Sequence, residues 1–190
     1  MELSVIVFLA LLALVGLTRL AELELSRRHR DELARRKIDR RSEPLYPWMV
    51  ILHAGVLAGA AVEVIWLRRP FVAALAASAG VLFLLATGLR WWAIRTLGAH
   101  WNIQVMDSAS LGVVATGPFR WVRHPNYLGV FIEILALPLI HGAWITALAG
   151  TAGNAWVLRN RLRVEESVLE SHPEYRAAMS GKARFLPGIF

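Results

Sequence analysis

Two short segments in the second half of the chain hold residues that could bind a charged small molecule. The first is Arg123-His124-Pro125-Asn126-Tyr127, where Pro125 suits the first turn of a helix. A helix N-terminus presents free N–H groups that can bind a carboxylate or a hydroxyl. The second segment holds Arg161 and Glu165, which lie on one helix face because they are four residues apart. Convergence of the two segments would form a polar ligand site.

Both segments also have simpler interpretations. His124 and Tyr127 can anchor a helix end at a membrane surface, and Arg161 with Glu165 can form an ordinary salt bridge on a solvated helix. The loop over residues 99–120 is nevertheless the most polar stretch between two apolar segments. We therefore expect it to do more than connect them.

The composition indicates an integral membrane protein. The chain has 190 residues, of which 56% are hydrophobic, and this share is high for a soluble domain. The net charge of +7 comes from Lys and Arg placed between apolar segments, whereas a nucleic-acid module gathers them on one soluble face. We therefore expect no nucleic-acid partner. Without cysteine, disulfides, zinc thiolates and thiol nucleophiles are excluded, and we expect no metal.

The fold class that we predict is all-α, a polytopic transmembrane helical bundle forming one domain over residues 1–190. Spanning ~30 Å of hydrocarbon takes roughly 20 apolar residues. About five segments qualify: 2–22, 46–67, 71–96, 126–140 and 142–161. The last two flank His141-Gly142 and should form an antiparallel hairpin, either spanning the membrane or buried in a core. Residues 1–97 would supply three transmembrane helices, and residues 98–190 the binding half.

Positive charges predict the orientation. Residues 27–41 carry eight Lys and Arg, whereas the opposite side has only Arg68 and Arg69, and positive loops stay cytoplasmic. The loop 97–125 and the C-terminal tail would then share the cytoplasmic side and form a pocket. The basic run suits an amphipathic helix on anionic lipid headgroups or a solvated connecting helix.

Ionisable residues inside the apolar segments need a partner or a cavity. They are Glu22, His53, Glu63, Arg90 and Glu133. We expect Arg90 to pair with Glu133 or Glu22 as a structural bridge, His53 to line a substrate cavity, and Glu63 to reach the outer interface.

The C-terminal half resembles the isoprenylcysteine carboxyl methyltransferases and their phospholipid methyltransferase relatives. The resemblance covers residues 98–187 and rests on 114–119, 123–129, Arg161 with Glu165-Glu166, and Pro173-Glu174-Tyr175. It implies S-adenosylmethionine as the cofactor and a binding set of Gln104, Leu111, Gly112, Val113, Val114, Phe119, His124, Pro125, Asn126, Tyr127 and Glu165. Phe119 departs from a frequent tyrosine, so it would stack without a hydrogen bond.

The resemblance implies methyl transfer to a carboxyl or hydroxyl oxygen of a lipophilic acceptor that enters from the bilayer. Arg161 would face the substrate, together with His53, and Arg161 and Glu165 would be the catalytic pair. Glu165 with Phe119, Trp121 or Tyr127 would hold the cofactor's positive charge. His124 would bind, or act as a base.

Several identities stay open at this stage. A weaker resemblance at residues 45–53 adds a long-chain polyketide pyrone or phenol to a prenylated cysteine as possible acceptors. A phospholipid N-methyltransferase and a non-catalytic scaffold or transporter subunit are alternatives. We expect membrane lipids as partners and a prokaryotic cytoplasmic membrane as the location, and the sequence does not indicate the oligomeric state.

Overall fold

The computed structural model describes residues 2–38, 41–107 and 111–186. Asp39 and Arg40 of the basic run, and positions 108–110 of the expected pocket loop, lie outside these ranges. Within them the chain is helical, with one isolated parallel bridge between Val122 and Ala183. The elements are α1 (Leu3–Arg35), α2 (Tyr46–Trp66), α3 (Ala73–Leu97), η1 (Gly98–His100), η3 (Gly117–Arg120), α4 (Pro125–Leu139), α5 (Trp144–Leu169) and α6 (Pro173–Met179).

α1 is longer than the sequence suggested. It runs without interruption through 33 residues, about 50 Å, so most of the described basic run continues the first helix and forms no separate surface helix. The apolar stretch ends near Leu20, but no glycine or proline follows it before the helix ends. Exposed Glu24–Arg28 and Glu32–Arg36 pairs support the last turns.

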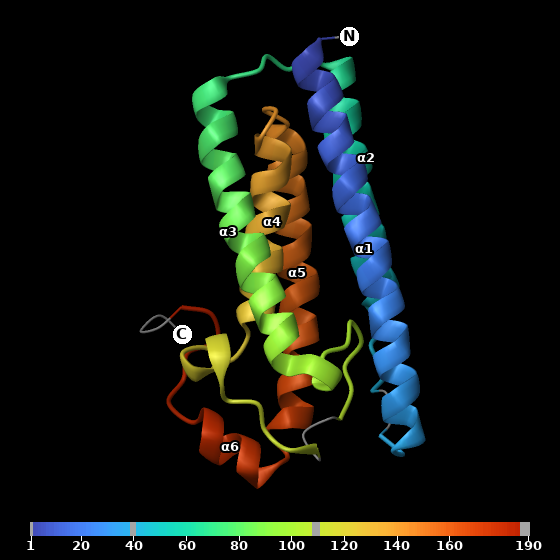
Figure 1. Cartoon of the computed structure of the whole chain (residues 1–190), viewed down its shortest axis with the longest axis vertical. Helices are drawn as coiled ribbons and strands as arrows, with labels where there is room; N and C mark the ends of the chain where they lie inside the picture. Colours follow the sequence, from blue (N-terminus) through green and yellow to red (C-terminus); the bar gives the residue numbers. More distant parts are fainter. Residues whose placement is uncertain (1, 39–40, 108–110, 187–190) are drawn as a thin grey trace.

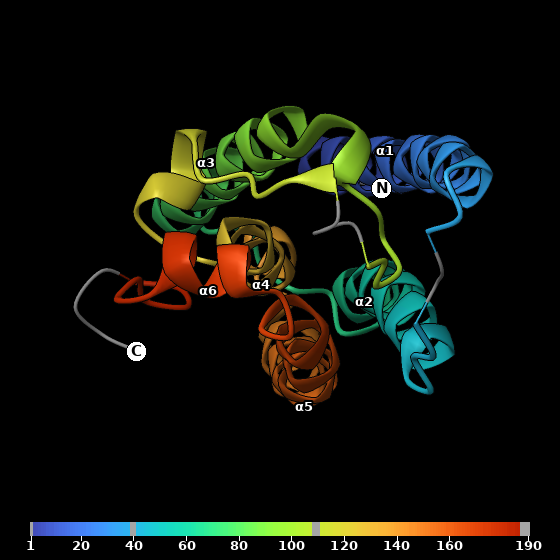
Figure 2. The same cartoon turned by 90° about the horizontal axis from the view of Figure 1, so that it is seen from below.

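The helices form a bundle in which α4 lies at the centre (Figures 1 and 2). α3 packs closely on α4 because Gly129 has no side chain: a Cβ there would lie 2.4 Å from Arg90 Cγ and 3.0 Å from the Ala86 carbonyl oxygen. α5 packs equally closely on α2 at Gly150, where a Cβ would lie 2.6 Å from Val56 Cγ2. Small residues thus allow close helix contacts, as in many membrane proteins.

α4 and α5 form the expected antiparallel hairpin. Gly142 makes the turn with a φ of +69°, a conformation that other residues rarely adopt. Glu63 of α2 accepts hydrogen bonds from the backbone N–H groups of Ile145 and Thr146, at 3.2 and 2.8 Å, and pairs with Arg69 at 2.9 Å. Glu63 therefore holds the start of α5 and is buried near the end of α2; that it lies at the outer interface stays a prediction.

A network of four charged side chains lies between α1, α3 and α4. Arg90 of α3 binds Glu22 of α1 at 2.5 Å and Glu133 of α4 at 2.9 Å. Arg19 binds the same two carboxylates at 2.8 and 2.7 Å, and Thr87 donates to Glu133 at 2.7 Å. Arg90 therefore pairs with both expected partners, and the two arginines balance the two glutamates.

Of the described helices, three are long and apolar enough to span a membrane: α1, α2, and α3 taken on to His100. α4 is apolar but has 15 residues, about 22 Å, which is short for a ~30 Å hydrocarbon core. α5 has 26 residues, with charged side chains in its last third. The chain is an integral membrane protein, and five spans remain a prediction.

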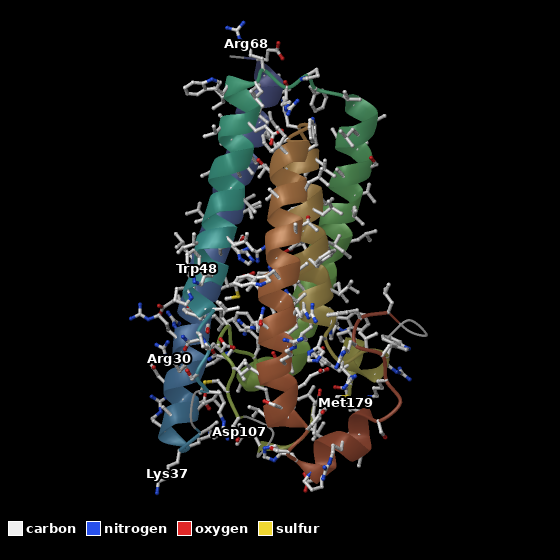
Figure 3. All side chains as sticks on the ribbon, turned by 180° about the vertical axis from the view of Figure 1, so that it is seen from behind. Arg30, Lys37, Trp48, Arg68, Asp107 and Met179 are labelled. Atoms are coloured by element: carbon white, nitrogen blue, oxygen red, sulfur yellow. The ribbon has the colours of Figure 1, made fainter. Side chains whose placement is uncertain are left out.

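The two ends of the bundle differ in polarity. The α2–α3 connection, with Arg68, and the α4–α5 turn lie at the end near the N-terminus (Figures 1 and 3). Arg30, Lys37, Asp107 and Met179 lie toward the opposite end, where η1, η3 and α6 also lie. All the polar segments expected to form the pocket thus gather at one end.

Candidate active site

A cavity of about 250 Å³ opens among the helices above the loop that follows α3. Eleven of the thirteen residues singled out from the sequence line it: His53, Gln104, Gly112, Val113, Val114, Phe119, His124, Asn126, Tyr127, Arg161 and Glu165. Leu111 instead packs in a small cluster with Leu33, Ile38 and Met106. Pro125 is buried at the first turn of α4 and shapes the turn.

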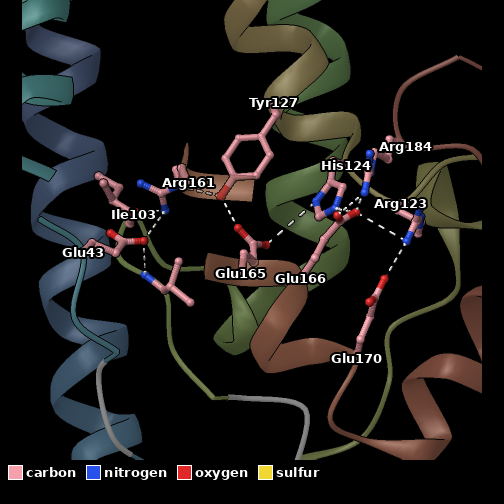
Figure 4. Close-up of polar contacts among 11 residues, drawn as sticks. Glu43, Ile103, Arg123, His124, Tyr127, Arg161, Glu165, Glu166, Glu170 and Arg184 are labelled. Atoms are coloured by element: carbon pink, nitrogen blue, oxygen red, sulfur yellow. Dashed lines mark hydrogen bonds and ion pairs between the residues drawn. The ribbon is translucent and has the colours of Figure 1, made fainter. Parts of the chain in front are cut away.

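Tyr127 connects the two charged residues of α5. Arg161 Nε donates to the Tyr127 hydroxyl at 2.6 Å, and this hydroxyl donates to a Glu165 oxygen (Figure 4). The expected i, i+4 pair of Arg161 and Glu165 is thus bridged by an aromatic side chain from α4. The Arg161 guanidinium also lies 5.4 Å from the centre of the Tyr127 ring.

Arg161 is held on its other side by the loop after α3 and by the segment before α2. Its Nη2 donates to the Ile103 carbonyl and lies 3.7 Å from Glu43 Oε1. The same Glu43 oxygen accepts the backbone N–H of Val105 at 3.0 Å. Glu43 was not identified from the sequence, because its partners are at least 60 residues away along the chain.

The Arg-His-Pro turn meets the end of α5 through the second glutamate of the pair. His124 Nε2 lies 3.3 Å from Glu166 Oε1, and His124 Nδ1 lies 3.9 Å from Glu165 Oε1. Arg123 reaches Glu170 at 3.2 Å. The turn and the double-glutamate helix end therefore converge at one end of the bundle (Figure 4).

The segment after α6 completes this contact. Arg184 binds both oxygens of Glu166, at 3.0 and 2.7 Å, and its carbonyl accepts the backbone N–H of His124 at 2.9 Å. Burial by itself raises the pKa of the Glu166 carboxyl, but the bonds from His124 and Arg184 and the charge of Arg123 outweigh burial and lower this pKa to about 2. No local pattern indicated that Arg184 binds Glu166.

A second set of contacts holds the loop under the cavity. Asp107 binds Arg41 at 2.8 Å and His172 at 2.7 Å. Burial raises the pKa of Asp107, but these two partners outweigh it and lower the pKa below its usual value. Ser26 of α1 binds Asn102 at 2.9 Å. The loop is thereby tied to α1, to the segment before α2 and to the turn before α6.

The part of the cavity that is lined by Gln104, Asn126 and Glu165, which we call its lower part, fits the polar groups of a nucleoside cofactor. Gln104 Oε1 and Asn126 Oδ1 are buried acceptors that have no hydrogen-bond partner among the described residues. S-adenosylmethionine presents hydroxyl, amine and ammonium donors, which suit such acceptors. Glu165 adds a negative charge beside the Tyr127 ring, which suits a cation.

One expected aromatic residue lies elsewhere. Trp121 is half exposed and packs edge-on against Trp92, with ring centres 5.8 Å apart. It is not among the residues that line the cavity. The aromatic residues that do line it near the turn include Phe119, Tyr127 and Tyr175. Tyr175 of α6 belongs to the tail motif, but the sequence did not predict that it lines the cavity.

Comparisons with known proteins match the same region. Residues 79–171 fit the model of the isoprenylcysteine carboxyl methyltransferase (ICMT) family. YpbQ of Bacillus subtilis, described as an uncharacterized protein, is 28% identical over 165 residues, covering 87% of this chain and 98% of YpbQ. An uncharacterized protein of Haemophilus influenzae is 28% identical over 89 residues, which are 46% of this chain and 52% of that protein.

Among solved structures, the eukaryotic intramembrane Ras methyltransferase ICMT is similar, with a TM-score of 0.61 and 24% identity. The match covers 75% of this chain and 53% of the eukaryotic chain, so this chain spans about half the length of that enzyme. The likeness shows a shared fold.

The family match begins within α3 and ends just after α5. It therefore includes the loop, the Arg-His-Pro turn, the hairpin and the double-glutamate helix end. Residues 79–171 of this chain are thus similar to the isoprenylcysteine carboxyl methyltransferase family.

Proposed function

We propose that the chain transfers a methyl group from S-adenosylmethionine to an oxygen of a lipophilic acceptor. The observation that carries the proposal is the junction of Tyr127, Arg161 and Glu165 beside the His124 turn, within a cavity that continues upward between apolar helices. The match of residues 79–171 to the family model supports the reaction class. We further propose that the cofactor enters from the cytoplasmic side, because the basic residues of α1 lie at this end.

The cofactor would lie at the polar end of the cavity. Gln104, Asn126 and the His124 turn would bind its donor groups, and the Gly112–Val114 stretch with Phe119 would pack on its flat parts. Glu165, held by the Tyr127 hydroxyl, would face its positive charge. When bound, S-adenosylmethionine supplies an electrophilic methyl group, so the protein needs no nucleophilic side chain.

Arg161 would orient the acceptor oxygen. A fixed guanidinium binds an anionic oxygen and favours its ionised form, which is the nucleophilic one. His124 would position the turn, since its Nε2 already lies 3.3 Å from Glu166. Alignment of the two reactants and exclusion of water would then provide most of the acceleration.

Arg161 also favours one acceptor class over another. A buried guanidinium attracts a carboxylate, a phenolate or an enolate, the reactive forms of the oxygen acceptors, whereas the reactive form of a phospholipid amine is neutral and gains no such attraction. We therefore rank a carboxyl or hydroxyl acceptor above phospholipid N-methylation. Both a prenylated cysteine and a long-chain pyrone or phenol satisfy this condition.

Calorimetric titration with S-adenosylmethionine, and with S-adenosylhomocysteine for comparison, tests the cofactor site on protein purified in detergent. Glu165→Ala should weaken the binding of S-adenosylmethionine, which carries the sulfonium charge, by about tenfold or more, as expected for loss of a charged partner. Glu174→Ala is the matched control, because Glu174 is exposed on α6 and outside the cavity. Absence of binding by the wild type would favour a non-catalytic scaffold, and equal binding by Glu165→Ala would remove Glu165 from the site.

Transfer from methyl-labelled S-adenosylmethionine in vesicles tests the acceptor class. The acceptors are supplied one at a time, as an S-farnesyl thioether acid, a long-chain phenol or pyrone, or phosphatidylethanolamine, and alkaline treatment identifies methyl esters among the products. Methyl esters release labelled methanol, whereas methyl ethers and methylamines keep the label. Label found only in phosphatidylethanolamine would contradict the proposed O-methylation.

A further inference from the structure

The cavity extends well beyond the residues proposed to bind the cofactor. Asn154 lines it on α5, seven residues before Arg161, which places the two Cα atoms roughly 10 Å apart along the helix. Val130, Val157 and Leu158 also line the cavity, and with Asn154 they form what we call its upper part. These three apolar side chains suit a hydrocarbon chain, whereas Asn154 is polar.

The amide nitrogen of Asn154 has no hydrogen-bond partner among the described residues that would explain its burial. Asn154 is only 4% exposed, and its Nδ2 makes no hydrogen bond to any described residue. It lies beside the first half of α2, a candidate span, because a Cβ on the neighbouring Gly153 would be 3.0 Å from Leu52 Cδ1. A polar group at such a depth is unfavourable unless something binds it, and ionisable or polar residues there commonly serve function.

His53 adds a second polar group to the upper part of the cavity. Its Nδ1 lies 2.7 Å from the Met49 carbonyl oxygen, so Nδ1 carries the proton and Nε2 is an acceptor. Arg19 also lines the cavity, but Glu22 and Glu133 bind its guanidinium. The upper part therefore offers an amide and an imidazole without a free net charge, which suits a neutral hydroxyl or carbonyl group.

The geometry points to Asn154, with His53, as a second recognition point for the acceptor. This inference rests on the proposed function: Arg161 holds the oxygen that receives the methyl group, and Asn154 binds another, neutral oxygen deeper in the membrane. The acceptor would thus carry a hydroxyl or carbonyl group beyond its reactive oxygen, at a depth where a plain prenyl chain offers only hydrocarbon. Asn154 would act on specificity, with no part in the methyl transfer itself.

Two matched probes test this directly. One is a para-alkylphenol, and the other is the same molecule with a ketone at the second chain carbon, too far from the ring for conjugation to change the acidity of the phenol. The wild type should prefer the ketone probe by about five- to tenfold in kcat/KM, as one added hydrogen bond in an apolar site allows. Asn154→Leu should lose this preference, with the KM for S-adenosylmethionine unchanged.

A structural role for Asn154 predicts a different result. Removing an unpartnered buried amide should leave the thermal midpoint of the ligand-free protein unchanged or higher, whereas loss of a structural hydrogen bond would lower it. Asn160→Leu is the matched control, because its amide binds the Trp156 carbonyl outside the cavity, and it should keep the ketone preference. If Asn154→Leu does not fold, Asn154→Ala, which also removes the amide donor, provides the same comparison.

Direct binding of the two phenols separates this inference from the proposed function. A wild type that does not bind S-adenosylhomocysteine refutes the function, yet its affinities for the phenols, measured by their thermal shifts, still decide the role of Asn154. Equal affinity for both probes, no affinity for either, or an undiminished ketone preference in Asn154→Leu overturns the inference.

Discussion

The charged network between α1, α3 and α4 makes a quantitative prediction about stability. Arg90 and Glu133 each have side chains that are 4% exposed and are 2.9 Å apart. Arg90→Gln alone leaves two buried carboxylates with only Arg19. Removing one partner from a buried ion pair costs about 3–5 kcal/mol, chiefly because a buried charge is left without compensation.

The double variant Arg90→Gln/Glu133→Gln should be less damaging than the two single changes predict. It leaves Arg19 and Glu22, which are 2.8 Å apart and together neutral. Since each single variant carries an uncompensated charge that the double variant lacks, the effects should not add. The coupling free energy should be about 2 kcal/mol.

A double-mutant cycle measures this coupling, with the free energy of unfolding obtained by denaturant titration in mixed micelles. The control cycle uses Arg28 and Glu24, a pair 3.0 Å apart with side chains 74% and 53% exposed, where coupling of about 0.3–0.5 kcal/mol is expected. Additive effects at Arg90 and Glu133, or a coupling no larger than in the control, would refute this explanation of how α1 is held on the bundle.

Three further changes test other contacts. Tyr127→Phe removes the hydroxyl between the arginine and the glutamate of α5 and should weaken S-adenosylhomocysteine binding by about tenfold in the same calorimetric assay; unchanged affinity would contradict the role of the bridge. Gly129→Ala places a methyl group against Arg90 and should lower stability by about 1–3 kcal/mol, whereas Gly88→Ala, with open space around its Cβ, should not. The pKa of the Glu166 carboxyl is about 2 in the folded protein, below its ordinary value of 4.5, so its contribution to the free energy of folding should be complete above pH 4.5 and be lost as the pH falls toward 2. Glu166→Gln should therefore flatten the curve of thermal midpoint against pH in this range. An equally steep fall in the variant would exclude this carboxylate as the cause.

The sequence predicted the helices where the chain itself marks their ends. The expected segments starting at 46 and 126 agree closely with α2 and α4, because Pro47 and Pro125 lie in their first turns. The predicted first segment, 2–22, ends before α1 does, since hydropathy marks where the chain leaves the membrane and does not mark where the helix stops. Helical hydrogen bonds continue through charged residues as readily as through apolar ones.

On α4 and α5 the sequence identified four residues that line the cavity and missed Asn154 and the apolar ones; the four are Asn126, Tyr127, Arg161 and Glu165. Successive helical residues point about 100° apart, so Glu165 faces the cavity while Glu166 faces Arg184, and the pair alone did not reveal this division. Glu43 and Arg184 act across the fold through contacts that no local pattern encodes. The depth of Asn154 in the cavity likewise depends on how α5 packs against α2.

An experimental structure with S-adenosylhomocysteine bound tests the central claim most directly. The nucleoside should lie between the His124 turn and Glu165, with donor groups toward Gln104 and Asn126. A nucleoside bound outside this cavity, or one that touches only one of the two segments, would contradict the account.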